Sequence, residues 1–183
     1  MGIGTITIET KRLKLRKLTF NDVDAIFTHL KSDERVTDNL VKGVHLDVEE
    51  TYAMVKEIID EYDNLSFYSW GMEIIESGEL IGLIDIYNLN SEESKCEVGY
   101  SIGYNWWNNG YGTEALEAVV NFAFNNLKVD IISATHNLDN PASGRIMEKV
   151  GMKKDCEIKN MITNSKGISK DCAIYSKKNN KLI

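Results

Sequence analysis

The feature that most constrains the fold of this chain is a pair of glycines separated by one residue. They lie in a loop that follows an apolar run and opens an amphipathic segment. Between residues 106 and 115 the chain reads Trp-Trp-Asn-Asn-Gly-Tyr-Gly-Thr-Glu-Ala. Gly110 and Gly112 can take backbone angles closed to other residues and let main-chain N–H groups approach an anion. The helix expected after them adds unpaired donors and the positive end of its dipole. The loop therefore predicts a site for a phosphorylated cofactor.

Two other phosphate-binding motifs do not fit this loop. Gly110-x-Gly112-x-x-Ala115 satisfies the dinucleotide fingerprint, but the first glycine of that motif directly follows the first strand of its domain. Here more than half of the chain precedes Gly110, and residues 104–109 separate the loop from the preceding strand run. No Gly-Lys-Ser/Thr follows the glycines, as a Walker loop requires. A loop that only starts a helix, with no ligand, stays open as an alternative.

Hydrophobic periodicity predicts a mixed sheet around this loop. Strands are expected over residues 5–18, 67–75, 80–87, 96–102 and 131–135, and residues 172–176 are the clearest part of a closing hairpin. The turn at 76–79, which contains Gly78, predicts a hairpin between the second and third of these strands. The strand at 96–102 then completes an antiparallel meander.

Sequence signals for helix starts lie between the expected strands. A capping residue before an apolar stripe occurs at three places: Thr19-x-x-Asp22, Asp47-x-x-Glu50 and Asn140-Pro141. The glycine loop opens a further helix over about 113–127, and Gly151 is placed to end the helix that Asn140 begins. Residues 31–46 are polar and irregular.

Length and composition fit one domain over residues 1–183, with a core at about 8–176. The chain has 183 residues, of which 43% are hydrophobic. It contains no run long enough to span a bilayer, and its N-terminus lacks the pattern of a signal peptide. The three cysteines, Cys96, Cys156 and Cys172, are odd in number and lack metal-ligand spacing. We therefore expect buried free thiols, no metal, no membrane partner and a reducing cytoplasm.

The formal net charge of −7 argues against nucleic acid as a partner. Affinity for a phosphate backbone depends on Lys and Arg contacts. Cationic substrates are the natural complement, although the surplus of acidic residues is also explained by a solvated surface.

A second motif lies downstream, where residues 136–152 read His-Asn-Leu-Asp-Asn-Pro-Ala-Ser-Gly-Arg-Ile-Met-Glu-Lys-Val-Gly-Met. Shorter pieces accompany it: Glu9-Thr10-x-Arg12-Leu13-x-Leu15-Arg16, Trp70-Gly71-Met72, Leu80-Ile81-Gly82 and Glu97-Val98-Gly99-Tyr100. With the glycine loop, this ordered set resembles the GNAT superfamily of acetyl-CoA-dependent N-acetyltransferases. More narrowly, it resembles the branch of the RimJ/RimL-type ribosomal-protein N-terminal acetyltransferases. The resemblance covers about residues 8–176.

The resemblance implies an α/β (α+β) GNAT fold, in which a mixed, largely antiparallel twisted sheet is flanked by about four helices. Acetyl-CoA is then expected in a cleft where two central strands splay apart. Backbone groups of one strand would hold the pantetheine and the acetyl carbonyl, and amides of the glycine loop would hold the pyrophosphate. The residues implied for cofactor binding are Tyr100, Ser101, Ile102, Trp107, Asn108, Asn109, Gly110, Tyr111, Gly112, Thr113, Asn140 and Ser143. For Asn140, contact with pantetheine and a plain helix cap both remain open.

The implied reaction is acetyl transfer to a primary amine, without a metal. The leading acceptor is the N-terminal α-amine of a protein or peptide. A small amine such as a polyamine, an amino sugar or an amino-acid-like metabolite is the alternative, and residues 31–46 are expected to help shape the acceptor pocket. A non-catalytic acyl-CoA sensor is a further alternative, and a homodimer is left open.

The chemistry requires a base for the amine and is helped by an acid for the departing thiolate. Glu97 is the best candidate base, directly or through water, and its alternative is a structural strand residue. Many relatives carry a tyrosine as the acid where this chain has Met147, and a thioether cannot donate a proton. That leaves Ser143, water or direct departure of the thiolate, because a thiol pKa is only about 8.5. His136 is a weaker candidate base, and His29 and His45 have no evident partner in the sequence.

Overall fold

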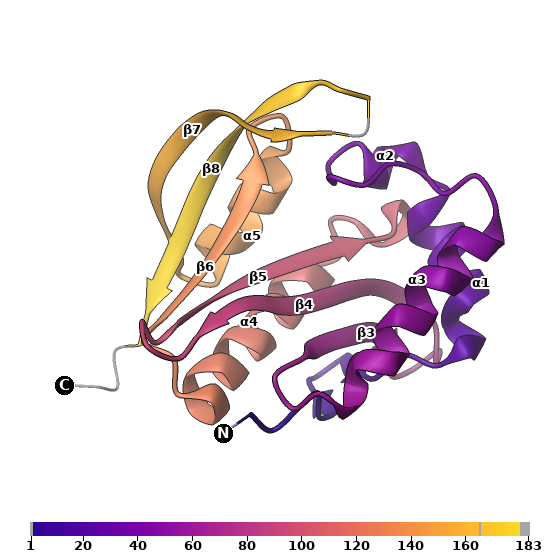
Figure 1. Ribbon diagram of the computed structural model, residues 1–183, viewed down its shortest axis with the longest axis horizontal. Helices are drawn as coiled ribbons and strands as arrows, with labels where there is room; N and C mark the ends of the chain where they lie inside the picture. Colours follow the sequence, from indigo (N-terminus) through magenta and orange to yellow (C-terminus); the bar gives the residue numbers. More distant parts are fainter. Residues whose placement is uncertain (1, 165, 180–183) are drawn as a thin grey trace.

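Strands in the order β1-β2-β3-β4-β5-β6-β8-β7 form one sheet in the computed structural model, which describes residues 2–164 and 166–179 (Figure 1). Their bounds are β1 Ile8–Glu9, β2 Leu13–Arg16, β3 Tyr68–Ile74, β4 Leu80–Asn90, β5 Lys95–Ile102, β6 Ile131–Asn137, β7 Lys153–Thr163 and β8 Ser169–Lys178. All neighbouring strands are antiparallel except β5 and β6, which are parallel. The mixed, largely antiparallel sheet is as predicted.

Helices cover both faces of this sheet. They are α1 Val23–Ile26, which continues into the π-helical turn η2 Phe27–Lys31, then α2 Glu34–Thr37, α3 Val48–Asp60, α4 Tyr111–Phe122 with the π-helical turn η5 Ala123–Leu127, and α5 Pro141–Lys149. Figure 1 shows α4 behind the central strands and α3 in front of one end of them. Residues such as Trp70, Ile84 and Leu116 form the core beneath α4, and Ile26 and Leu83 belong to a second core beneath α1 and α3.

The pairing between β5 and β6 ends early. It joins Lys95 to Ile131, Cys96 to Ile132 and Glu97 to Ser133, and no β6 partner is recorded for the rest of β5. Beyond Glu97, β5 continues to pair with β4 as far as Ile102, while β6 follows β8. The two central strands therefore diverge, as the predicted splayed pair requires.

The expected helix caps are present. The Thr19 amide donates to Asp22 Oδ2 at 2.7 Å, and the Glu50 amide donates to Asp47 Oδ1 at 3.0 Å. Asp22 also accepts two hydrogen bonds from Arg16, which lower its pKa against the opposing effect of burial. These contacts fix the start of α1 against the end of β2.

The expected single strand over residues 5–18 is wrong, because the chain turns back on itself at Thr10. The result is two short strands, β1 and β2, paired with Ile8 opposite Leu15. The Thr10 hydroxyl accepts from the Leu13 amide at 2.9 Å and lies 3.0 Å from Leu13 O. A threonine side chain that bonds to nearby backbone stabilises such a turn locally.

The expectation of buried thiols holds for two of the three cysteines. Cys96 and Cys172 are buried, but Cys156 is exposed. Cys156 lies on β7, which is at the edge of the sheet and has few buried positions on either face. Among the described residues, no cluster of three His, Cys, Asp or Glu side chains is suited to a metal ion, and no helix is long and apolar enough to cross a bilayer.

Candidate active site

The glycine loop has left-handed backbone at two positions directly before α4. Gly110 has φ +82° and stands just before the first residue of the helix, and Asn108 has φ +61°. The first N–H groups of a helix have no acceptor within the helix, so those of residues 111–113 face outwards from the loop. With the positive end of the dipole of α4, they form a cradle that suits a pyrophosphate.

The role expected for Gly112 is wrong in one respect. Gly112 lies within α4, and its φ is outside the left-handed region. A Cβ there would lie 2.9 Å from Ile146 Cδ1 and 3.1 Å from Ile102 Cδ1. Gly112 therefore lets α4 approach α5 and the end of β5, whereas Gly110 provides the unusual backbone conformation.

A salt-bridged network that the sequence did not reveal holds this loop in place. Glu114 accepts hydrogen bonds from Thr10 Oγ1, Arg12 N and Arg12 Nε, each at 2.7 Å. Arg12 Nη1 also donates to Asn109 O at 3.0 Å, and its guanidinium lies 4.4 Å from the centroid of the Tyr111 ring. The hydrogen bonds lower the pKa of Glu114 although burial opposes them. The only sign of this network in the sequence was the pair of motifs Thr10-x-Arg12 and Gly112-x-Glu114, which lie far apart in the chain.

The loop is also tied to the diverging strand. Trp107 Nε1 donates to Ile102 O, the last carbonyl of β5, at 2.7 Å. Ser101 precedes it and pairs with Leu83 of β4, and Thr113 lies in the first turn of α4. The expected pantetheine strand and pyrophosphate loop are thus one continuous structure.

Tyr100 and Ser143 meet across the divergence. The Tyr100 hydroxyl donates to Ser143 O at 3.1 Å and lies 2.8 Å from Ser143 Oγ. Burial raises the pKa of Tyr100 to about 12, although the contact with Ser143 opposes this rise. Asn140 caps α5 and accepts from the Ser143 amide at 3.4 Å, so its role as a helix cap is confirmed. Met147 is 1% exposed and lies in the core beneath α4.

Glu97 lies at the other end of β5 from the glycine loop. It is the last residue of β5 that pairs with β6, and its Oε1 accepts from Asn88 Nδ2 at 2.9 Å. It lines a cavity of about 570 Å³ together with Asn88, Asn90 and Ser133. The structure therefore separates the candidate base from the phosphate loop by the length of β5.

The three histidines all have partners. His29 Nδ1 is 2.9 Å from Leu80 O, His45 Nδ1 is 2.8 Å from Thr51 Oγ1, and His136 Nδ1 is 2.7 Å from Asn137 O. His136 is the second-to-last residue of β6.

Two further contacts join the segment that begins at α2 to the β7–β8 turn and to the end of β6; Figure 1 shows α2 close to the hairpin of β7 and β8 at one end of the molecule. Lys166 Nζ lies 2.8 Å from Asp38 Oδ1, and Asn137 Nδ2 donates to Asn39 Oδ1 at 3.3 Å. The segment after α2 thus reaches the end of β6, on the side where β5 and β6 diverge.

A charged group that the sequence analysis missed lies on the face of the sheet towards α1 and α3. Asp85 is in the middle of β4, where the run Leu-Ile-Asp-Ile-Tyr reads as an ordinary strand. Burial raises the pKa of its carboxyl to about 6, although Ser69 and the charge of Lys31 oppose this rise. Nothing in the local pattern shows that these three side chains converge.

Comparison with known proteins now decides the family. Residues 12–153 match the model of the Acetyltransferase (GNAT) domain. The chain belongs to the GNAT acetyltransferases. An uncharacterized N-acetyltransferase of Bacillus subtilis, YoaA, is 30% identical over 169 residues, which cover 92% of this chain and 94% of that protein.

Solved structures of GNAT proteins share the fold. Ribosomal-protein-S5-alanine acetyltransferase from Vibrio fischeri superposes with a TM-score of 0.83 at 16% identity, over 97% of this chain and 99% of that one. Spermidine N-acetyltransferase from Vibrio cholerae, solved with CoA and spermine, gives a TM-score of 0.78 at 17% identity, over 92% and 96% of the two chains. As a GNAT N-acetyltransferase the chain is an acyltransferase, and acetyl-CoA is the donor typical of this family.

Proposed function

We propose that this GNAT protein transfers the acetyl group of acetyl-CoA to the free α-amine at the N-terminus of a protein or peptide. The use of acetyl-CoA as the donor is supported by the divergence of β5 from β6 beside the main-chain cradle at the start of α4. The choice of an N-terminal α-amine as the acceptor rests on the motifs that resemble the Rim-type branch. The fold shared with a ribosomal-protein-S5-alanine acetyltransferase is consistent with it.

In this proposal the cofactor is held mainly by backbone. Amides of residues 107–113 would bind the pyrophosphate, and the backbone of Tyr100, Ser101 and Ile102 would contact the pantetheine and acetyl carbonyl. When bound, acetyl-CoA supplies the thioester carbon that the amine attacks. The left-handed conformation of Gly110 and the tether from Arg12 to Asn109 support this assignment.

Ser143 is the proposed proton donor to the departing thiolate. Its Oγ is hydrogen-bonded to the Tyr100 hydroxyl, so it is held in place and has a second hydroxyl as a proton source. The core position of Met147 supports this choice, since that side chain neither donates a proton nor faces solvent.

Glu97 is proposed to pass the acceptor's proton to water. It lies at the rim of a cavity of about 570 Å³ and is bound through one oxygen to Asn88. An α-amine has a pKa near 8, so a carboxylate that relays its proton to solvent is sufficient at neutral pH.

A small cationic amine is the second candidate acceptor, and one observation favours it. Asp85 and Glu97 both lie on the sheet face towards the helices that precede β3, so two carboxyls there could pair with a cationic amine. Complementary charge steers a cationic substrate and fixes its orientation.

An acceptor screen tests the proposal. Release of the CoA thiol is followed with acetyl-CoA and three acceptors: a peptide that begins with serine or alanine, the same peptide with a blocked N-terminus, and spermidine. We expect thiol release with the free peptide and none with the blocked one. Activity with spermidine alone would show that the acceptor is a small amine and not a peptide N-terminus. Tight binding of acetyl-CoA without turnover of any amine would favour the acyl-CoA sensor.

A further inference from the structure

The face of the sheet opposite α4 carries two polar side chains outside the family motifs, Asp85 and Tyr87, beside Glu97. Residues of β4 and β5 alternate between the two faces, and Asp85 and Tyr87 share a face with Glu97 and Gly99. Figure 1 shows α3 over one end of this face only. Tyr87 is 42% exposed, so solvent reaches these side chains from that side.

Asp85 has a neighbour on each side in the sheet. It pairs with Gly99 on one side and with Ser69 of β3 on the other. A Cβ at Gly99 would lie only 3.1 Å from Tyr87 Cε1, so the Tyr87 ring lies against Gly99. Burial raises the pKa of Tyr87 to about 12, and the charges of Glu97 and Asp85 add to this, so both carboxyls act on the phenol.

Neither of the two polar residues next to Asp85, Ser69 and Lys31, forms a hydrogen bond or ion pair of ordinary geometry with its carboxyl, and the Ser69 hydroxyl is itself a buried group without a described partner. Ser69 is 2% exposed, and its hydroxyl forms no hydrogen bond of ordinary geometry with any described group. Lys31, at the end of η2, is 8% exposed, and no ion pair within 4.0 Å joins it to Asp85 among the described residues. Buried polar and charged groups are normally paired, because leaving them unpaired costs free energy.

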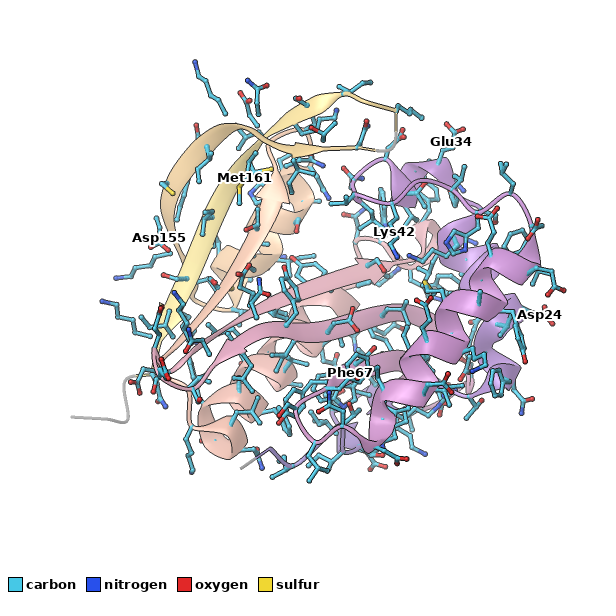
Figure 2. All side chains as sticks on the ribbon, in the orientation of Figure 1. Asp24, Glu34, Lys42, Phe67, Asp155 and Met161 are labelled. Carbon is cyan, nitrogen blue, oxygen red and sulfur yellow. The ribbon has the colours of Figure 1, made fainter. Side chains whose placement is uncertain are left out.

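Lys31 influences Asp85 through its charge and not through an ion pair with the carboxylate oxygens. Burial lowers the pKa of Lys31, the charge of Asp85 opposes this, and the charge of Lys42 adds to it. Lys42, which is labelled in Figure 2, lies in the loop after α2. The charge of Lys31 favours the ionised carboxylate of Asp85, and it disfavours a second ammonium that keeps its proton nearby.

Strand register brings Asp85 closer than Glu97 to the proposed position of the acetyl group. Ser101 is four residues from Glu97 along β5, or about 13 Å at 3.3–3.4 Å per residue. Asp85 lies opposite Gly99, so Ser101 is its diagonal neighbour at about 7–8 Å. An amine that reaches the acetyl carbonyl next to Ser101 is therefore within reach of Asp85.

We propose that Asp85 is the carboxylate that binds the ammonium group of the acceptor amine and accepts its proton, with Ser69 and Tyr87 as the other polar walls of the pocket. This rests on the proposed transfer to an amine. The ammonium donates to Asp85, and one N–H proton moves to a carboxylate oxygen, which leaves a neutral amine and a carboxylic acid.

The lone pair of the neutral amine then attacks the acetyl carbon. As the C–N bond forms, the C–S bond breaks and sulfur keeps the electron pair. The nitrogen loses its second proton and the thiolate gains one through Ser143 or water. The proton on Asp85 leaves to solvent, through water or Glu97, so one proton is released per amide formed.

A titration without acetyl-CoA tests the binding step. Carboxyl ¹³C signals are followed while n-butylamine or spermidine is added, and the Asp85 signal is assigned by its absence in Asp85→Asn. We expect a saturable shift of the Asp85 signal that persists in the Glu97→Gln variant. A saturable shift confined to Glu97, or no saturable shift at Asp85, would overturn the proposal.

Kinetics test the proton step with whichever screened acceptor the wild type acetylates. Asp85→Asn should lower kcat/KM for that acceptor by at least about 100-fold, the usual scale for a general base, and Glu97→Gln by less than about tenfold. Ser69→Ala should raise KM severalfold with little change in kcat. Asp85→Asn activity within threefold of the wild type would overturn the proposal. Failure of the wild type to acetylate any amine would reject the proposed function, while the titration would still decide the role of Asp85.

Discussion

The two sides of the proposed active site are built from different kinds of groups. On the cofactor side, Gly110 and the first turn of α4 present main chain, and the surrounding charged groups are fully paired through Arg12 and Glu114. On the acceptor side, the chemistry depends on side chains, and the charges of Asp85 and Lys31 are not joined by an ion pair. A main-chain cradle tolerates side-chain changes where the backbone conformation is ordinary, whereas one substitution can alter the acceptor side.

This difference also separates stability from function. A paired network such as that of Glu114 stabilises the fold and the loop together. An ionised carboxylate in a buried setting destabilises the fold, and such a residue is retained where the chemistry requires it. Each prediction below tests this difference between the two sides.

The largest effect is expected from Gly110→Val. A β-branched residue is strained at φ +82°, so the loop should leave its left-handed conformation and acetyl-CoA affinity should fall at least about 100-fold by calorimetry. Gly78→Val is a matched control, because Gly78 has φ +70° and nothing within 4 Å of an added Cβ. Equal loss of affinity in both variants would mean that general destabilisation explains the result.

Ser143→Ala should lower turnover by about tenfold to several hundredfold if Ser143 protonates the thiolate. Tyr100→Phe removes only its hydroxyl partner and should give a smaller loss, with acetyl-CoA affinity unchanged. Steady-state kinetics at matched melting temperatures measures both. Wild-type turnover in Ser143→Ala would leave water or direct thiolate departure as the route.

Glu114→Gln should weaken acetyl-CoA binding by about tenfold. The neutral amide keeps the shape but loses the charge-assisted bonds to Arg12, which are worth about 1.5–3 kcal/mol each. Glu117→Gln, one turn further along α4 on its exposed side, is the control and should bind as the wild type does. Unchanged affinity in Glu114→Gln would show that the loop keeps its form without this network.

The last prediction is a gain in stability from Asp85→Asn. The pKa of Asp85 is raised from 3.8 to about 6, so the folded state binds more protons than the unfolded state between about pH 4 and 6. Wild-type stability should therefore fall as pH rises through that window, by up to about 3 kcal/mol. Denaturant unfolding should show Asp85→Asn more stable than the wild type at pH 7.5. A less stable variant at that pH would mean that the ionised carboxyl has stabilising partners.

The sequence predicted the elements of the proposed cofactor side because local spacing determines main-chain conformation. Gly110, the cap at Asn140 and the strand at 96–102 each lie in a short motif, and the structure has them in the expected elements. The turn at Thr10 was missed because one side-chain contact divides a run that reads as a single strand.

The acceptor side could not be predicted in the same way. Asp85, Ser69 and Lys31 come from two strands and a helix, and each is unremarkable within its own segment. Only the register of β3, β4 and β5 brings them together. The π-helical turn that ends at Lys31 also has no signal in the hydrophobic pattern.

The division of the site into two sides is tested most directly by one calorimetric series with acetyl-CoA. The wild type and Asp85→Asn should bind acetyl-CoA with dissociation constants that agree within about twofold, and Gly110→Val should bind at least about 100-fold more weakly. If Asp85→Asn loses as much affinity as Gly110→Val, or if the wild type does not bind acetyl-CoA, the account is contradicted.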